Sequence, residues 1–347
     1  MTIKITDGDL LQQTDVDAIV NTVNCVGVMG KGIALQFKKK WPANFKAYSE
    51  ACKRNEVRVG KMHVYDAGAL ATPKYVINFP TKDHWRGKSK IKFISEGLQD
   101  LTKIIDKYRI QSIAIPPLGC GNGGLDWDTV EKLIKSAFKD LPDVEVRLFA
   151  PHGAPNAKDL EIRTLRPRMT HGRAAVLKVI ETYRSLNYGL SKIEVQKLAY
   201  FLQLAGESLN LQFEKQTYGP YADTLRHVLD RMDGHFVRGV GDGVVESEIE
   251  PVQEALDEAN EFIASNNNCP ELVERVNRVK ELIVGFQTTY GMELLSTVHW
   301  VSKQEDANSV EDAFDKVQSW NKRKRDLMKF EHVQVAWQQL EDQGWLN

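Results

Sequence analysis

The 347-residue sequence predicts an α/β domain followed by a mostly α-helical domain. Short β-branched runs alternate with amphipathic helical patterns in the first half, and from about residue 172 the pattern is almost wholly helical. Between the two halves, residues 150–156 contain two prolines and a glycine, which end regular structure. A chain of this length also suits two domains, at roughly 100–200 residues each.

Five apolar runs rich in β-branched residues are the expected strands of the first domain, namely residues 3–5, 18–24, 75–79, 110–115 and 144–149. The expected helices are residues 33–40, 42–52, 90–108 and 126–138. Because strands and helices alternate, we expect a largely parallel sheet that is covered on both faces.

The second domain is expected to span residues 172–347, with helices at 174–186, 191–209, 220–230, 251–265, 269–290, 311–320 and 330–342. Ser191 followed by Glu194 predicts a capping box at the start of one of them. The first domain is expected at residues 1–155, with a linker at 156–171. A short basic passage through Arg163, Arg166, Arg168 and Arg173 fits either a linker or a docking strap.

Composition excludes several classes of protein. No apolar run approaches the ~18 residues of a spanning helix, and the first residues lack an apolar signal core. The four cysteines are far apart and form no CxxC pair, so we expect a reduced, cytosolic protein without structural zinc or another cofactor. Charge is uneven: residues 1–155 carry 23 Lys and Arg against 17 Asp and Glu, whereas the remainder carries 23 against 30. The two halves therefore suit different partners.

Two glycine-rich loops, residues 27–32 and 119–124, each follow a strand-like run and precede a helix. Their backbone N–H groups are suited to surround an anion, aided by the helix N-terminus. The second loop matches GxGxxG, but it comes late for a dinucleotide-binding unit. The first has a Gly-Lys pair without the Ser or Thr and the spacing of a P-loop. Simple glycine turns remain the alternative, although two facing loops are suited to clamp a diphosphate.

Two further motifs accompany these loops, Gly8-Asp9-Leu10 and the run Asp17-Ala18-Ile19-Val20-Asn21-Thr22-Val23-Asn24. The ordered set resembles a macrodomain, the ADP-ribose-binding fold, over about residues 1–150. Residues 24–34 together with Gly119-Cys120-Gly121 resemble the branch that removes ADP-ribose from acidic residues or nucleic acid. The resemblance implies a mixed sheet covered by helices on both faces.

It also implies an ADP-ribose site. Asp9 would accept a hydrogen bond from the adenine amino group, Asn24 would hold the distal ribose, and the two loops would wrap the diphosphate. The implied ligand-binding residues are Asp9, Leu10, Asn21, Asn24, Gly27, Val28, Met29, Gly30, Lys31, Gly32, Ile33, Pro117, Leu118, Gly119, Cys120, Gly121, Asn122, Gly123 and Gly124.

Lys82 follows a predicted strand and matches the lysine that this branch is thought to use for catalysis. A lysine amine can attack the anomeric carbon of the distal ribose, provided that burial or a cationic neighbour lowers its pKa. The alternative is a solvated loop lysine.

The human relative of this branch has an aspartate partner where this chain has about Gly123. Asp126 is near but also suits a helix cap, Asp83 and His84 suit the surface, and Cys120 suits packing.

In the second half, residues 197–203 followed by Tyr218-Gly219-Pro220-Tyr221 resemble a helical antitoxin-type domain over residues 172–235. The helical spacing of Leu198, Tyr200, Phe201 and Leu204 is nevertheless typical of core residues, and Gly219-Pro220 is expected to start a helix. The histidines His227, His235, His299 and His332 are scattered and read as structural rather than metal ligands.

Between Arg238 and Arg275 the sequence has no Lys or Arg but carries Asp242, Glu246, Glu248, Glu250, Glu254, Asp257, Glu258, Glu261, Glu271 and Glu274. This acidic run suits a solvated face or a surface that meets a basic, nucleic-acid-binding partner.

The two halves together resemble the DarG family, the antitoxins to DarT, which attaches ADP-ribose to thymidine in single-stranded DNA. The resemblance implies a cytoplasmic DNA ADP-ribosyl glycohydrolase whose C-terminal domain binds and inhibits the toxin. The alternatives are a hydrolase for ADP-ribosyl-glutamate or ADP-ribosyl-aspartate in proteins and a non-catalytic ADP-ribose reader.

Overall fold

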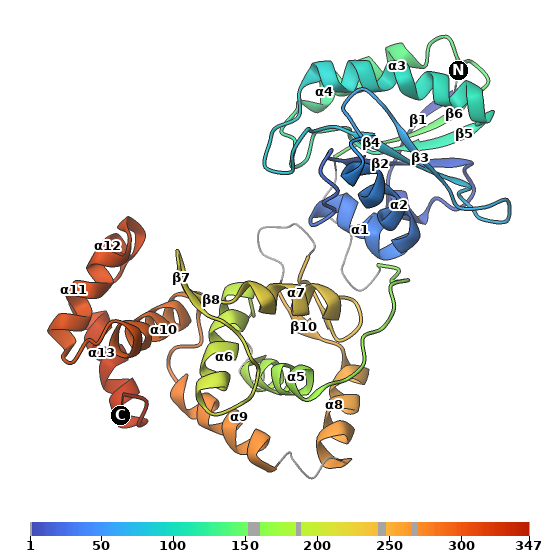
Figure 1. Cartoon of the computed structure of the whole chain (residues 1–347). Helices are drawn as coiled ribbons and strands as arrows, with labels where there is room; N and C mark the ends of the chain where they lie inside the picture. Colours follow the sequence, from blue (N-terminus) through green and yellow to red (C-terminus); the bar gives the residue numbers. More distant parts are fainter. Residues whose placement is uncertain (1, 152–159, 185–188, 242–247, 266–269, 347) are drawn as a thin grey trace. The chain divides into compact units, whose positions relative to one another are not determined.

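The computed structural model describes residues 2–151, 160–184, 189–241, 248–265 and 270–346 (Figure 1). The chain divides into two compact units. The first contains the described residues up to Leu165 together with Gly241, and the second contains the other described residues from Arg166 onward. The start of the predicted linker and the ends of two predicted helices, Leu186 and Cys269, lie outside the described residues.

The first unit is a six-stranded mixed sheet with helices on both faces. Its elements in chain order are β1 (Thr2–Thr6), η1 (Leu10–Gln12), β2 (Ala18–Val23), α1 (Gly32–Lys40), α2 (Pro42–Lys53), β3 (His63–Asp66), β4 (Tyr75–Pro80), α3 (Ile91–Tyr108), β5 (Ser112–Ile115), α4 (Trp127–Ala137) and β6 (Glu145–Phe149). The five predicted strands and four predicted helices are all present.

The strand order is β1-β6-β5-β2-β4-β3, and every neighbouring pair is parallel except β3 with β4. Helices α3 and α4 lie on one face of the sheet and α1 and α2 on the other (Figure 1). Separate apolar clusters fill the two sides, one including Ile94 and Ile134 and the other including Phe37. The central strands are therefore buried on both faces, as their continuous apolar sequence predicts.

Strand β3 is absent from the sequence-based prediction. It has only four residues, its side chains are half-buried or exposed, and it pairs at the edge of the sheet through register contacts such as His63 with Asn78. A short edge strand shows little apolar alternation in its sequence. Strand β3 therefore forms because it pairs with β4, and its own residues have little preference for a strand.

The second unit is mostly helical around one continuous core. Its elements are α5 (His171–Arg184), α6 (Lys192–Leu204), β7 (Glu214–Gln216), β8 (Gly219–Tyr221), α7 (Asp223–Met232), β9 (Val237–Arg238), β10 (Glu250–Pro251), α8 (Gln253–Ser265), α9 (Pro270–Leu282), α10 (Thr289–Gln304), α11 (Val310–Trp320), α12 (Lys322–Leu327) and α13 (Phe330–Asp342). The predicted capping box of Ser191 and Glu194 is present at the start of α6.

Several predicted helix bounds in the second unit are wrong. Gly219 and Pro220 form strand β8 instead of starting a helix, since the Gln196 side chain holds both backbone groups of Ala222 in an extended conformation. The helix predicted to reach residue 209 ends at Leu204, and Gly206 follows with a φ of 104°. Leu204 is exposed, so its predicted place in the core is wrong. The helix therefore ends where a glycine adopts a positive φ, although the apolar pattern of the sequence continues beyond that point.

The predicted helix 269–290 is two helices, because Gly285 has a φ of 84° and Thr288 caps the next helix, α10, by accepting a hydrogen bond from Gly291 N. Likewise the helix predicted from residue 251 starts at Gln253, since Pro251 pairs with Val237 in a short sheet. Helix α10 is buried along most of its length, so it has no amphipathic stripe to mark it in the sequence.

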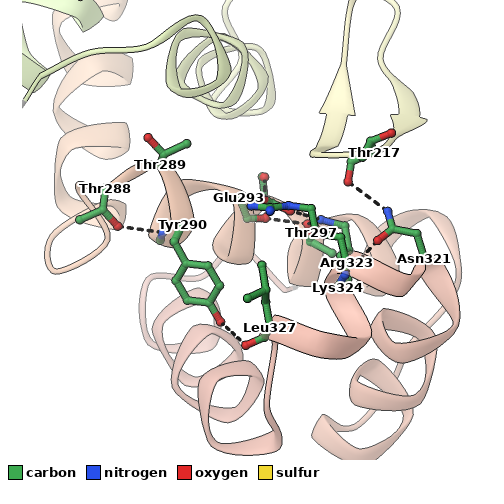
Figure 2. A network of polar contacts seen from close by, with 12 residues as sticks. Thr217, Thr288, Thr289, Tyr290, Glu293, Thr297, Asn321, Arg323, Lys324 and Leu327 are labelled. Carbon is green, nitrogen blue, oxygen red and sulfur yellow. Dashed lines mark hydrogen bonds and ion pairs between the residues drawn. The ribbon is translucent and has the colours of Figure 1, made fainter. Parts of the chain in front are cut away.

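A buried polar network joins α10 to α12 inside the second unit (Figure 2). Lys324 Nζ donates to Glu293 Oε1 at 2.8 Å and to Thr297 Oγ1 at 3.0 Å, and Arg323 also contacts Glu293 at 3.2 Å. Asn321 Nδ2 donates to Thr217 O at 3.1 Å, which ties the β7–β8 hairpin to the same helices. The network fixes how the last helices pack.

Residues 161–173 contact each unit in turn. Arg163 N donates to Lys39 O at 3.0 Å, and Glu161 pairs with Lys40 at 3.0 Å, so this part of the segment packs on the first unit. Arg166 pairs with Glu258 at 2.7 Å in the second unit. Side-chain and backbone contacts therefore hold both ends of this segment.

Candidate active site

The predicted site residues meet at one edge of the sheet. Asp9 follows β1, Asn24 follows β2, Lys82 follows β4, and Pro117 and the second glycine loop follow β5. These four strands are parallel, so their carboxyl ends lie on the same edge, where open α/β sheets bind ligands. The two glycine loops follow β2 and β5, which are neighbours, and Lys82 follows β4 on the other side of β2.

Asn24 orders the first glycine loop. Its Oδ1 accepts from Val26 N at 3.0 Å and Val28 N at 3.3 Å, and its Nδ2 donates to Val28 O at 2.5 Å. Tyr48, which is fully buried, donates its hydroxyl to Asn24 O at 2.6 Å. The Asn24 side chain is thus largely occupied by its own loop, with one amide hydrogen left to offer a ligand.

Gly27 needs to be glycine for two reasons. Its φ is 79°, and a Cβ there would lie 3.3 Å from Ser49 Oγ. After it, Val28, Gly30 and Lys31 are exposed, Ile33 is half-buried, and Met29 is buried in the apolar cluster beneath the loop. The buried methionine anchors the loop while its exposed neighbours leave their backbone groups accessible.

Asn21 lies beneath the first loop and is fully buried. Its Nδ2 donates to Asn78 Oδ1 at 3.0 Å, and Asn78 Nδ2 in turn donates to Asn44 Oδ1 at 2.7 Å. These three asparagines connect β2, β4 and α2. The geometry gives Asn21 a supporting position rather than the ligand-facing one that the sequence predicted.

The second glycine loop is a tight backbone structure. Gly119 has a φ of 74°, and its carbonyl accepts from Leu125 N at 3.1 Å. Gly124 N donates to Gly121 O at 3.0 Å, and Ser89 N donates to Gly123 O at 3.1 Å. Leu118, just before the loop, is buried in the core. The loop is therefore preformed, with Gly121 and Asn122 exposed at its tip.

No side chain fits at Gly123. A Cβ there would lie 2.2 Å from Gly119 O and 2.3 Å from Ser89 Oγ. The aspartate that the macrodomain resemblance places at about this position in the human relative therefore has no equivalent here. The close backbone approach explains the difference.

The two loops face one another, and Lys82 reaches across them. A Cβ on Gly32 would lie 3.3 Å from Asn122 Nδ2, and Lys82 Nζ donates to Asn122 O at 2.6 Å. The backbone of Lys82 is fixed beside the first loop, because Cys25 N donates to Asp83 O at 3.1 Å and Thr81 N donates to Val23 O at 3.0 Å. The site therefore holds the Lys82 amine beside two loops of backbone N–H groups.

The pKa of Lys82 is lowered from its ordinary value, first by burial and second by the positive charge of Lys88. Either cause would meet the condition for a nucleophilic lysine, and both act on Lys82. A lowered pKa increases the fraction of neutral amine, which is the nucleophilic form. Lys88 itself was missed, although it lies in the same basic segment only six residues after Lys82.

The other candidate groups are less well placed. Asp126 caps α4, accepting from Thr129 N at 2.9 Å and Thr129 Oγ1 at 2.7 Å, and these bonds lower the pKa of its carboxyl. Burial raises the pKa of the Cys120 thiol to about 11, so it stays protonated at neutral pH. Asp83 and His84 are exposed.

Asp9 caps the short helix η1, accepting from Leu11 N through Oδ1 at 2.9 Å, and Leu10 is buried below it. Among the described residues, His, Cys, Asp and Glu form no group of three or more that is suited to hold a metal. The described helices are also too short or too polar to cross a membrane.

The parallel sheet edge and its two facing glycine loops define a macrodomain, and the Macro domain family matches residues 20–134. A Thermus aquaticus protein named "DNA ADP-ribosyl glycohydrolase" is 46% identical over 98% of this chain and 93% of its own length. The chain therefore belongs to the DNA ADP-ribosyl glycohydrolase family, of the DarG type.

Two other relatives match less than half of the chain. The structure titled "Macrodomain of Mycobacterium tuberculosis DarG" is 57% identical, with a TM-score of 0.43, and covers 44% of this chain and 99% of its own. A Thermosipho africanus protein named "DNA ADP-ribosyl transferase-DNA ADP-ribosyl glycohydrolase fusion protein" is 32% identical over 43% of this chain and 42% of its own length.

Proposed function

We propose that the first unit removes ADP-ribose from thymidine in single-stranded DNA, with Lys82 as the nucleophile. The observation that carries this proposal is the position of the Lys82 amine. Its Nζ lies 2.6 Å from Asn122 O in the second loop, its backbone is fixed beside the first loop, and its pKa is lowered. Family membership supports the substrate, since the Thermus aquaticus relative is named for a DNA ADP-ribosyl linkage.

The two loops bind the diphosphate and the distal ribose through backbone N–H groups, including those of Gly30, Lys31, Gly121 and Asn122, which are exposed. Asp9 accepts a hydrogen bond from the adenine amino group. Asn24 orders the first loop and offers its remaining amide hydrogen to the distal ribose, and Asn21 supports it from below. Binding in this way directs the anomeric carbon C1″ toward Lys82.

The reaction proceeds by two displacements at C1″. The neutral Lys82 amine forms a bond to C1″ while the bond from C1″ to the thymine nitrogen breaks. The amine loses a proton on bonding, and the departing base takes up a proton. Water then attacks C1″ of the ribosyl–lysine adduct and the bond from C1″ to Lys82 Nζ breaks. The water oxygen stays on the released ADP-ribose as its C1″ hydroxyl, and one proton of the water goes to the amine.

Release of ADP-ribose tests the proposal. An ADP-ribosylated thymidine oligonucleotide and an ADP-ribosyl-glutamate peptide are incubated with the wild-type chain and with Lys82→Ala. We expect release from the oligonucleotide and a loss of at least about a thousandfold in the variant, with ADP-ribose affinity by calorimetry retained. Release from the peptide alone favours a protein hydrolase. Binding without release from either substrate indicates a reader.

For the second unit we propose binding to, and inhibition of, a DarT-type toxin. One relative carries both a DNA ADP-ribosyl transferase and a glycohydrolase in its name, which links the two activities in a single chain. Helix α8 supports the proposal with Glu254, Asp257 and Glu261, all exposed. Asp242 and Glu246 of the predicted acidic run lie outside the described residues.

Part of the acidic run is already neutralised. Glu258 pairs with Arg166, Glu250 with Arg184, and Glu271 with Arg275. The exposed acids of α8 are therefore the better candidates for steering a basic partner. We expect E254K/D257K/E261K to slow association with the toxin and to weaken the salt dependence of its rate. The matched control is E331K/E341K/D342K on α13, which reverses the same number of exposed charges. An equal slowing in both variants contradicts the proposal.

A further inference from the structure

The segment after β4 combines positive charge with an exposed aromatic side chain. Residues 81–90 contain Lys82, Arg86, Lys88 and Lys90 against one acid, Asp83. Within it, 48% of Trp85 is exposed to solvent. An indole of this exposure, next to the active-site lysine and among cations, is suited to contact a ligand that is both flat and anionic.

Three flat side chains in this segment lie next to one another. The Arg86 guanidinium lies 4.6 Å from the centre of the Trp85 ring, and the His84 ring lies 5.5 Å from it at an interplanar angle of 30°. Nucleobases stack on aromatic rings and on guanidinium planes without regard to sequence, and a guanidinium also pairs with phosphate. His84, Trp85 and Arg86 therefore offer a nucleotide both flat surfaces for its base and a cation for its phosphate.

Backbone contacts hold the stack near the active site. Within the segment, Gly87 N donates to His84 O at 2.9 Å, and Arg86 N donates to His84 Nδ1 at 3.2 Å. Asp83 O accepts from Cys25 N, two residues before the first glycine loop, at 3.1 Å, and Ser89 N donates to Gly123 O of the second glycine loop at 3.1 Å. Trp85 is only three residues from Lys82, so the segment can span at most about 10 Å between them.

We infer that His84, Trp85 and Arg86 form a stacking platform for the unmodified nucleotide next to the modified thymidine, with its base on the stacked side chains and its phosphate on Arg86. This inference rests on the proposed function of Lys82. The platform binds the DNA strand beyond the ADP-ribose group, so it favours modified DNA over a modified amino acid side chain. Trp85 is thus a positioning residue for the polynucleotide.

The experiment compares two substrates with the full-length chain. One is ADP-ribosyl-thymidine, which has no flanking nucleotide, and the other is a single-stranded oligonucleotide with one central ADP-ribosylated thymidine. The ratio of kcat/KM for the oligonucleotide to that for the nucleoside is measured for wild type, Trp85→Ala, Trp85→Phe and Arg86→Ala. The matched controls are Leu70→Ala and Lys103→Ala, which alter exposed residues outside the segment.

We expect Trp85→Ala to lower this ratio about tenfold, mainly through KM for the oligonucleotide, and Trp85→Phe to restore most of it. Arg86→Ala lowers the ratio less, and the loss disappears at high salt. An equal kcat/KM of the wild type for both substrates, or an equal loss on both in Trp85→Ala, overturns the inference and leaves the proposed function standing. If the wild type binds ADP-ribose but cleaves neither substrate, the proposed function itself fails.

Discussion

Lys82 in the first unit and Lys197 in the second both donate to a backbone carbonyl, Lys82 to Asn122 O at 2.6 Å and Lys197 to Pro220 O at 2.5 Å. In both, burial is the main cause of a lowered pKa and a second lysine adds to it. The shift is larger for Lys197, whose pKa falls to about 7. By the criterion of pKa alone, the second unit would hold the better nucleophile.

The two lysines differ in how accessible they are to solvent and substrate. Only 1% of Lys197 is exposed, and its neighbours are core helices and the Glu293–Lys324 network. Lys82 is half-buried, at the edge of a sheet, with two loops of accessible N–H groups beside it. A perturbed pKa marks a functional site only where a substrate can reach the group; elsewhere it is a consequence of packing.

Chemical labelling tests the difference in access directly. With an amine-reactive ester at neutral pH, we expect Lys82 to be modified more than about a thousandfold faster than Lys197, because Lys197 reacts only after the second unit opens. Mass spectrometry of proteolysed samples measures both rates, with ADP-ribose expected to protect Lys82 alone. Similar rates for the two lysines would remove the distinction.

The buried network of the second unit is expected to contribute to stability but not to catalysis. Glu293→Ala leaves the Lys324 ammonium, which is completely buried, without its carboxylate, and we expect a loss of about 3 kcal/mol in the free energy of unfolding. Urea unfolding measures it, with exposed Glu331→Ala as the control. The double variant Glu293→Leu/Lys324→Met is expected to recover most of the loss. A stable Glu293→Ala protein would contradict this account.

The first unit depends instead on the shape of its backbone. Gly123→Ala forces the second loop away from Gly119 O, and we expect ADP-ribose affinity to fall about a hundredfold, since small displacements in a preformed site are costly. Gly121→Ala meets no atom within 4 Å and should lose far less. Calorimetry with ADP-ribose measures both, and equal losses would indicate that crowding at Gly123 does not matter.

The smallest expected effect is on the pH dependence of release. Under the proposed mechanism the neutral Lys82 amine is the reactive form, so we expect kcat/KM to rise with pH until the amine is deprotonated. The lowered pKa of Lys82 is expected to place this rise below the ordinary lysine range. Lys88→Met removes a positive charge, raises the pKa of Lys82 and moves the rise to higher pH. A shift to lower pH, or the same shift in Lys103→Met, would show that Lys88 does not act through charge.

Local sequence signals predicted parts of both units well. The Asp126 cap, the Ser191–Glu194 capping box and the five parallel strands of the first unit depend on residues close together in the chain. The edge strand β3 and the bounds of α9 and α10 were not predictable in this way. They depend on pairing with β4 and on glycine conformations such as that of Gly285, which apolar periodicity does not record.

The sequence by itself determined the kind of site, because glycine loops after parallel strands and a lysine after another strand specify which groups are available. Tertiary structure decided what each group does. In the folded chain, Asn21 and most of the hydrogen-bonding groups of Asn24 support the first loop. The backbone of Gly119 occupies the space that a side chain at Gly123 would need, and Lys88 lies near Lys82. The tertiary structure also buried Lys197, although that lysine has the lower pKa. Burial and charge proximity are properties of packed chains, so residues distant in sequence fix them.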